Sequence, residues 1–183
     1  LSTVNGDLEL DDGLEAGRLA VKAASGDVRV REARCGEVCF KSASGDLDAG
    51  GEIGSIQAET ASGDVELSGS FGAVRAATAS GDVEVQGSVR EIRCSSASGD
   101  AKVRTQTLPD KLEISTKSGD CRLYLPAGEG FALQFSTVSG DLDTEFDLVG
   151  PVGARSGEAM YLDGGGRSFR ITSISGDISL RQN

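Results

Sequence analysis

A Ser-Gly-Asp triplet recurs along the whole chain, and its aspartates are the residues whose type and spacing could do chemistry. The first copy is altered to Asn5-Gly6-Asp7, and the glycines then follow at steps of 20, 19, 18, 18, 18, 20, 21 and 36 residues. A nearly fixed period indicates one structural unit stacked on itself. Stacked carboxylates about 4.8 Å apart could bind Ca²⁺, a hard cation that takes several oxygen ligands. The glycines and aspartates concerned are Gly6, Asp7, Gly26, Asp27, Gly45, Asp46, Gly63, Asp64, Gly81, Asp82, Gly99, Asp100, Gly119, Asp120, Gly140, Asp141, Gly176 and Asp177.

These residues also have a structural interpretation, which we favour. Glycine allows a sharp corner, and an aspartate or serine beside it can hydrogen-bond the backbone of the turn, so the carboxylates can be occupied by amide N–H groups. The calcium-binding β-roll repeat needs a glycine-rich nonapeptide, which this chain lacks. We therefore predict structural corners, with no metal and no cofactor. Under the calcium alternative, Asp27 to Asp141 would be the metal site.

Catalysis is the second chemistry to weigh. The chain has no histidine, so the usual general base is missing. Outward acids such as Glu66 and Glu84 would stack about 4.8 Å apart, near the carboxylate separation of retaining glycosidases. Such acids recur simply because the repeat recurs, and a solvated face explains them. We predict that the protein is not an enzyme, with a polysaccharide-acting enzyme as the weakest alternative.

Four cysteines could bind metal or form disulfides: Cys35, Cys39, Cys94 and Cys121. Cys94 and Cys121 fall on inward positions of coils that are not adjacent, which would hold them beyond disulfide distance. We predict reduced, buried thiols that act as small hydrophobes. Because the chain contains no histidine, a zinc site at Cys35 and Cys39 is not expected.

The elements that must position these residues follow from the alternation after each triplet. Val83 and Val85 after Asp82 show the period of a half-buried strand. The unit reads as strand, bend, strand and corner, and it is too short to bury its own apolar row unless coils stack with parallel strands. This predicts an all-β fold, a β-helix-like β-solenoid with about 18–20 residues per coil. The alternative fold, a β-propeller, needs blades of about 40 residues, which is twice the period of this repeat. Small hydroxyl residues should form a buried ladder beside the corners: Thr60, Thr78, Ser96, Thr116, Thr137 and Ser173.

We predict one β-solenoid domain over residues 1–183. Regular coils span residues 1–141, and an irregular, hairpin-like capping excursion spans 142–170. The final corner and strand occupy 171–183. A cap of this kind would protect strand edges that otherwise invite polymerisation.

Composition limits the partners. The formal net charge of −11 disfavours nucleic acid and anionic lipid head groups. The sequence has no apolar run long enough to span a membrane and no signal peptide. It starts at Leu1 within a repeat, which indicates a longer precursor, so membrane attachment is expected only through a segment outside this sequence. The remaining expected partners are a protein or surface ligand and a second copy of the chain.

Three segments carry a resemblance to a known family: the repeated Ser-Gly-Asp strands, Leu123-Tyr124-Leu125-Pro126-Ala127, and the stretch from Gly164 to Ile178. Together they resemble the bacterial putative-adhesin family of Ser-Gly-Asp β-strand repeat proteins, a domain of unknown function, over nearly the whole chain. The resemblance implies a β-helix-like solenoid in a bacterial, cell-envelope or extracytoplasmic context, with a cytoplasmic location left open. It supplies no catalytic residues.

Two functional hypotheses follow. The first is a non-catalytic, adhesin-like interaction or scaffold module whose flat sheets bind an undefined ligand. The alternative is a structural solenoid that assembles end to end. Light scattering across concentration would separate them.

Overall fold

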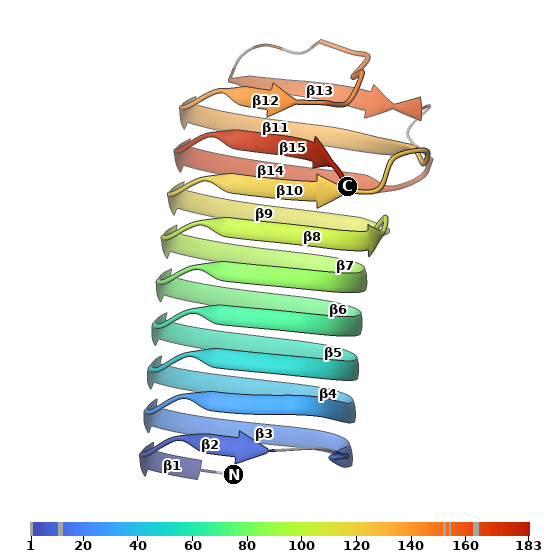
Figure 1. Ribbon diagram of the computed structural model, residues 1–183. Coiled ribbons are helices and arrows are strands. Elements are labelled where there is room, and N and C mark those ends of the chain that lie inside the picture. The colour runs from blue at the N-terminus through green and yellow to red at the C-terminus, as the bar shows by residue number, and fades with distance from the viewer. Residues whose placement is uncertain (1, 11–12, 152, 154, 163–164) are drawn as a thin grey trace.

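The computed structural model describes residues 2–10, 13–151, 153, 155–162 and 165–183. It shows the predicted β-solenoid: parallel strands of successive coils stack along a rod, and the described residues contain no α-helix (Figure 1). The strands are β1 (Ser2–Asn5), β2 (Leu8–Leu10), β3 (Glu15–Ser25), β4 (Val28–Ser44), β5 (Leu47–Ser62), β6 (Val65–Ser80), β7 (Val83–Ser98), β8 (Ala101–Thr107), β9 (Lys111–Ser118), β10 (Cys121–Leu125), β11 (Phe131–Ser139), β12 (Leu142–Thr144), β13 (Ser156–Tyr161), β14 (Ser168–Ser175) and β15 (Ile178–Gln182).

The long strands β4 to β7 each bend near the middle, so one strand contributes to two faces of the rod. We call the face made by β2, β8, β10, β12, β15 and the first halves of β4–β7 the front face. The rear face consists of β1, β3, β9, β11, β13, β14 and the second halves of β4–β7 (Figure 1). Neighbouring coils pair residue for residue: Val65 lies beside Val83, and Leu67 beside Val85. Alternation therefore places every second residue of a strand inside the rod, where it joins a column of buried side chains.

Glycine is required where the coils turn. Gly81 at the corner has φ +149° and Gly87 at the bend has φ +130°, conformations that residues with a Cβ rarely adopt. A Cβ on Gly81 would overlap the carbonyl oxygen of Gly63 in the coil below, and one on Gly87 would overlap that of Gly69. Both glycines are thus fixed by backbone conformation and by the close stacking of coils.

The buried polar residues of the described chain are the hydroxyl ladder beside the corners and Thr105. All six predicted members of this ladder are buried, which confirms the sequence prediction. Thr78 Oγ1 donates to the carbonyl oxygen of Gly63 at 3.3 Å, and Ser96 Oγ donates to that of Gly81 at 3.2 Å. These bonds tie one coil to the corner of the neighbouring coil.

The last coil does not lie at the end of the rod, as the order of the sequence had implied. β14 pairs in parallel with β9 on one side and β11 on the other, and β15 lies between β10 and β12 (Figure 1). The C-terminal coil is therefore inserted between two coils that precede it in the chain. Its apolar residues repeat the common coil pattern, so it satisfies the strand edges of both neighbours.

The predicted excursion over 142–170 contains β12, β13 and the first residues of β14. Residues 152, 154 and 163–164 of it lie outside the described residues. In this range β12 ends at Thr144, and β14 begins at Ser168. Within this excursion, β13 runs antiparallel along β11 and bridges to Val149 through Met160. Four rings close this end of the core, and Phe131 stacks on Phe169 at 4.7 Å with Phe146 and Tyr161 beside it.

Candidate functional site

The corner aspartates form a continuous hydrogen-bonded ladder. Asp82 N donates to Asp64 Oδ1 at 2.7 Å, and Asp82 Oδ1 accepts from Asp100 N at 2.7 Å. The same bond joins each successive corner from Asp7 upward, at 2.7–3.1 Å, and it runs from Asp120 through Asp177 to Asp141 because the last coil is inserted. Each carboxylate thus bonds the amide of the neighbouring coil, whereas the sequence had suggested the amides of its own corner.

Several second carboxylate oxygens are also engaged. Arg122 donates from Nη1 to Asp100 Oδ2 and from Nη2 to Asp120 Oδ2, both at 2.8 Å. Asp27 Oδ2 lies 3.5 Å from Arg29 Nη2. Within the described ranges, no three Asp, Glu, Cys or His side chains are grouped as a cation would require. The arrangement joins the coils, since every Oδ1 of the ladder before its last member, Asp141, accepts an amide of the neighbouring coil.

The acids considered for catalysis lie side by side but are not an open pair. Glu66 and Glu84 are register partners on the front face. Glu84 Oε1 lies 2.7 Å from Lys102 Nζ, so this acid is paired with the next coil. A half-exposed ion pair of this kind contributes little stability.

All four cysteines are free thiols, and Cys94 and Cys121 lie inside the rod. Burial raises the pKa of Cys94 to about 12. Burial likewise raises the pKa of Cys121 to about 11, although a contact with Thr116 Oγ1 at 3.5 Å lowers it slightly. Cys35 is buried and Cys39 half-buried. At neutral pH the two interior thiols stay protonated, which is the state of a packing residue.

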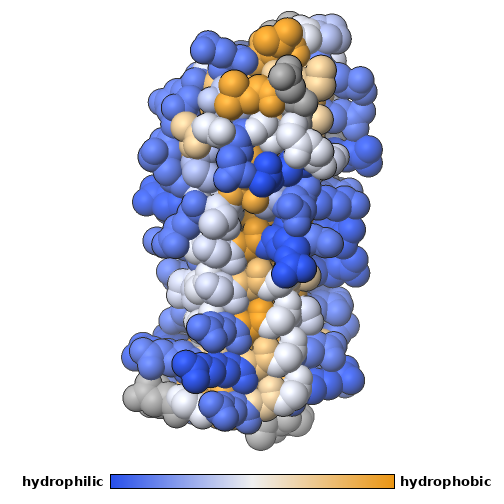
Figure 2. Space-filling view, turned by 90° about the vertical axis from the view of Figure 1, so that its right-hand side faces the viewer, coloured by the Kyte–Doolittle hydropathy of each residue, from blue (hydrophilic) through white to orange (hydrophobic). Residues whose placement is uncertain are grey.

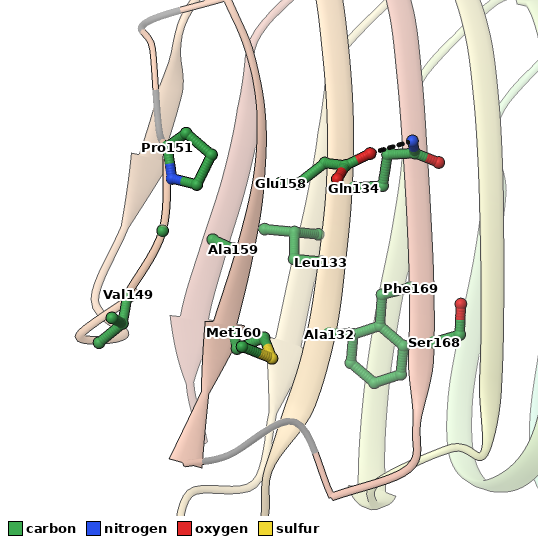
Figure 3. Close-up of a pocket in the computed structure, with 11 residues that line it drawn as sticks. Ala132, Leu133, Gln134, Val149, Pro151, Glu158, Ala159, Met160, Ser168 and Phe169 are labelled. Atoms are coloured by element: carbon green, nitrogen blue, oxygen red, sulfur yellow. Dashed lines mark hydrogen bonds between the residues drawn. The ribbon is translucent and has the colours of Figure 1, made fainter.

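A hollow on the rear face near the distal end is the best candidate for binding. This distal groove, about 450 Å³, crosses β11, β13 and β14 (Figure 3). The small side chain of Ala132 lies between its register partners Ser168 and Met160, and all three line the groove. Met160 on β13 and Val149 on the segment outside it form an apolar rim and are 50% and 72% exposed, and Pro151 lies on the same segment as Val149. The groove therefore gathers exposed apolar side chains in one hollow of this face.

A polar bridge crosses the groove. Gln134 Nε2 donates to Glu158 Oε1 at 2.8 Å, and Arg170 Nε donates to Gln134 Oε1 at 3.0 Å (Figure 3 shows the first bond). The three residues come from β11, β13 and β14, so each holds the next in place. On the far side of the bridge a second hollow of about 540 Å³ is lined by Ser136, Ser156 and Thr172, among others.

Sequence reasoning missed this groove because its β14 side is formed by the inserted coil. Ser168 and Arg170 lie more than 30 positions from their partners Ala132 and Gln134 in the sequence. One feature of the sequence could have indicated it. The last glycine step of 36 residues equals two ordinary steps of 18, which is long enough for the chain to pass one coil position before the final coil forms.

The bend side of the rod is a weaker candidate for a binding surface. Figure 2 shows an apolar stripe along the bend side of the rod, with an apolar patch near the distal end. A hollow of about 380 Å³ on the bend side is lined by Phe71, Val89 and Leu108, yet these side chains are almost wholly buried. Among the described residues, no helix has the length and apolarity to cross a bilayer.

Comparison with known proteins places the chain in a family. A comparison with curated proteins gave no match. A crystal structure of "a putative cell adhesion protein" from Clostridium sporogenes ATCC 15579 aligns over 98% of this chain and 92% of its own, with 10% identity and a TM-score of 0.36. The family model described as Toastrack DUF4097 matches residues 1–181. The chain therefore belongs to the Toastrack DUF4097 family.

Proposed function

We propose that this protein is a non-catalytic, adhesin-like interaction module of the bacterial cell envelope, and that the distal groove is its binding surface. The observation that carries the proposal is the groove itself, where exposed apolar side chains meet an ordered polar bridge. Apolar surface with a few fixed polar groups is the usual composition of a ligand site. The solenoid supplies a rigid support for it.

The structure supports a binding role over catalysis in a specific way. Catalysis needs a group free to accept or donate a proton at the reacting atoms. In the groove, Glu158 is bonded to Gln134, which is bonded in turn to Arg170. Such a network can orient a ligand. Glu158, the acid of the bridge, is already hydrogen-bonded and is therefore less available for proton transfer.

The test is binding of the fluorescently labelled chain to envelope fragments of the source bacterium. Met160→Asp places a charge on the groove rim, and Ile174→Asp is the matched control, since Ile174 is 49% exposed on the same face but outside the groove. Binding lost in the first variant and kept in the second supports the proposal. Equal binding by both variants would remove the groove from the account.

Self-assembly into longer rods is the second candidate. It is favoured by the short front-face strands β2 and β12, each of which pairs on one side only among the described residues. Short edge strands, however, are a common protection against edge-to-edge association. Light scattering that rises steeply with protein concentration would support assembly, and a constant mass would support the interaction module.

A further inference from the structure

The front face carries a second hollow, separate from the distal groove. This front hollow has a volume of about 550 Å³ and is lined by Gln86, Arg104, Gln106, Pro126, Ala127 and Asn183. Its size is within the range of small-molecule sites. The lining contains one charged side chain, three primary amides and two apolar residues from β7, β8 and the segments that follow β10 and β15.

Arg104 is the distinctive residue of the front hollow. Its guanidinium carbon lies 4.6 Å from the centre of the Tyr124 ring, its register partner on β10. The described residues give Arg104 no carboxylate partner. Stacking on an aromatic ring orients a guanidinium while leaving its N–H groups free to donate.

The neighbouring cations are already neutralised. Lys102 pairs with Glu84 at 2.7 Å, and Arg122 pairs with Asp100 and Asp120 at 2.8 Å. Arg181 is paired with Asp143 and Glu145. Arg104 is thus a local positive site on a chain of net charge −11. Because salt screens distant charges beyond about 8 Å at physiological ionic strength, a bound anion would respond mainly to Arg104.

The amides complete the arrangement. Asn183 Nδ2 donates to the carbonyl oxygens of Thr105 at 2.6 Å and Tyr124 at 3.4 Å, which fixes this side chain and leaves its Oδ1 free to accept. Gln86 and Gln106 are exposed and can both donate and accept. Primary amides suit neighbouring hydroxyl groups, while Pro126 and Ala127 offer an apolar wall to C–H groups.

We propose that the front hollow binds a sugar acid, with Arg104 pairing its carboxylate and Gln86, Gln106 and Asn183 bonding its hydroxyls. A planar guanidinium matches a carboxylate through two parallel hydrogen bonds. The amides select a polyhydroxylated ligand over a bare carboxylate. The hollow lies on the opposite face from the distal groove, so this site stands or fails independently of the proposed function.

The test is a titration of the ¹⁵N-labelled full chain with D-glucuronate, followed through the Arg Nε–H and the Gln and Asn side-chain amide signals. Acetate and D-glucose are separate arms, which present the carboxylate alone and the hydroxyls alone. We expect saturable shifts of Arg104, Gln86, Gln106 and Asn183 with glucuronate only. Arg104→Gln should weaken binding at least about tenfold, the loss typical of a charged hydrogen bond.

Two further variants keep the result interpretable. Arg31→Gln removes an exposed arginine from β4, away from the hollow, and should bind glucuronate as the unmodified chain does. Arg104→Lys keeps the charge without the planar fork, and should weaken binding even if the glutamine variant fails to fold. Absence of shifts, full binding by both Arg104 variants, or equal effects of acetate or glucose and glucuronate would each overturn the proposal.

Discussion

Replacing Gly81 by alanine tests whether the corners are fixed by stacking as well as by backbone conformation. Gly81 has φ +149°, and an added Cβ would overlap the carbonyl oxygen of Gly63. Its own N–H donates to the carbonyl oxygen of Ser98 at 3.0 Å, so the corner cannot move without loss of that bond. The matched control is Gly128, which has φ +94° and open space where its Cβ would lie.

The two variants should differ because only one suffers the overlap. Strain at a glycine-only conformation costs of order 1–3 kcal/mol, and overpacking adds about 1–3 kcal/mol, so Gly81→Ala should lose about 2–6 kcal/mol. Gly128→Ala should lose about 1–2 kcal/mol from conformation alone. Urea unfolding followed by far-UV circular dichroism gives both values. Equal losses in the two variants would refute the stacking explanation.

Three further predictions concern the ladder, the thiols and the inserted coil. Asp82→Ala should lose about 1.5–3 kcal/mol, because the amide of Asp100 loses a charged acceptor, whereas Asp82→Asn keeps an oxygen acceptor and should lose less; equal urea midpoints would contradict the ladder. Cys94, with its pKa at about 12, should resist thiol reagents in the native state at pH 8. Rapid labelling of Cys94 without denaturant would contradict this resistance. Because the Cys94 thiol ionises at lower pH in the unfolded chain than in the folded one, its contribution to the free energy of unfolding should fall by about 1.4 kcal/mol per pH unit from pH 9 toward 12. The amides of Ile171 and Ile178 should exchange with solvent as slowly as those of central coils, since their strands are paired on both sides; fast exchange in hydrogen–deuterium experiments would contradict the insertion.

The coil architecture could be predicted because its rules are local. Backbone geometry and the period of a strand account for the corner glycine, the alternating apolar residues and the buried hydroxyl. The conformation of each coil can therefore be predicted from its own residues. The order of stacking is different. Phe169, Ile171 and Ser173 fill the same inward positions as Leu112, Ile114 and Thr116 of β9, so one coil fits beside another equally well. Periodicity alone therefore cannot place the last coil.

The candidate site inherits that difficulty. Arg170 and Gln134 meet because β14 is inserted beside β11, and no local motif predicts the contact. The same holds for Asn183, which reaches the front hollow because β15 lies beside β10. The aspartates, by contrast, could be assigned to corners from their neighbours, although the sequence did not show that their hydrogen bonds cross between coils.

Thermal unfolding in calcium tests most directly whether the aspartate ladder is structural. If the ladder held Ca²⁺ in the folded state only, one site at one hundred times its Kd would add about 2.7 kcal/mol, which is a rise in Tm of about 5–10 °C for a chain of this size. If the Oδ1 atoms are occupied by amides, Tm in millimolar CaCl₂ and in EDTA should agree within about one or two degrees. MgCl₂ at equal ionic strength is the control, because the charge of −11 allows a small nonspecific rise. A large shift specific to calcium would contradict the account and make Asp27 to Asp141 a metal site.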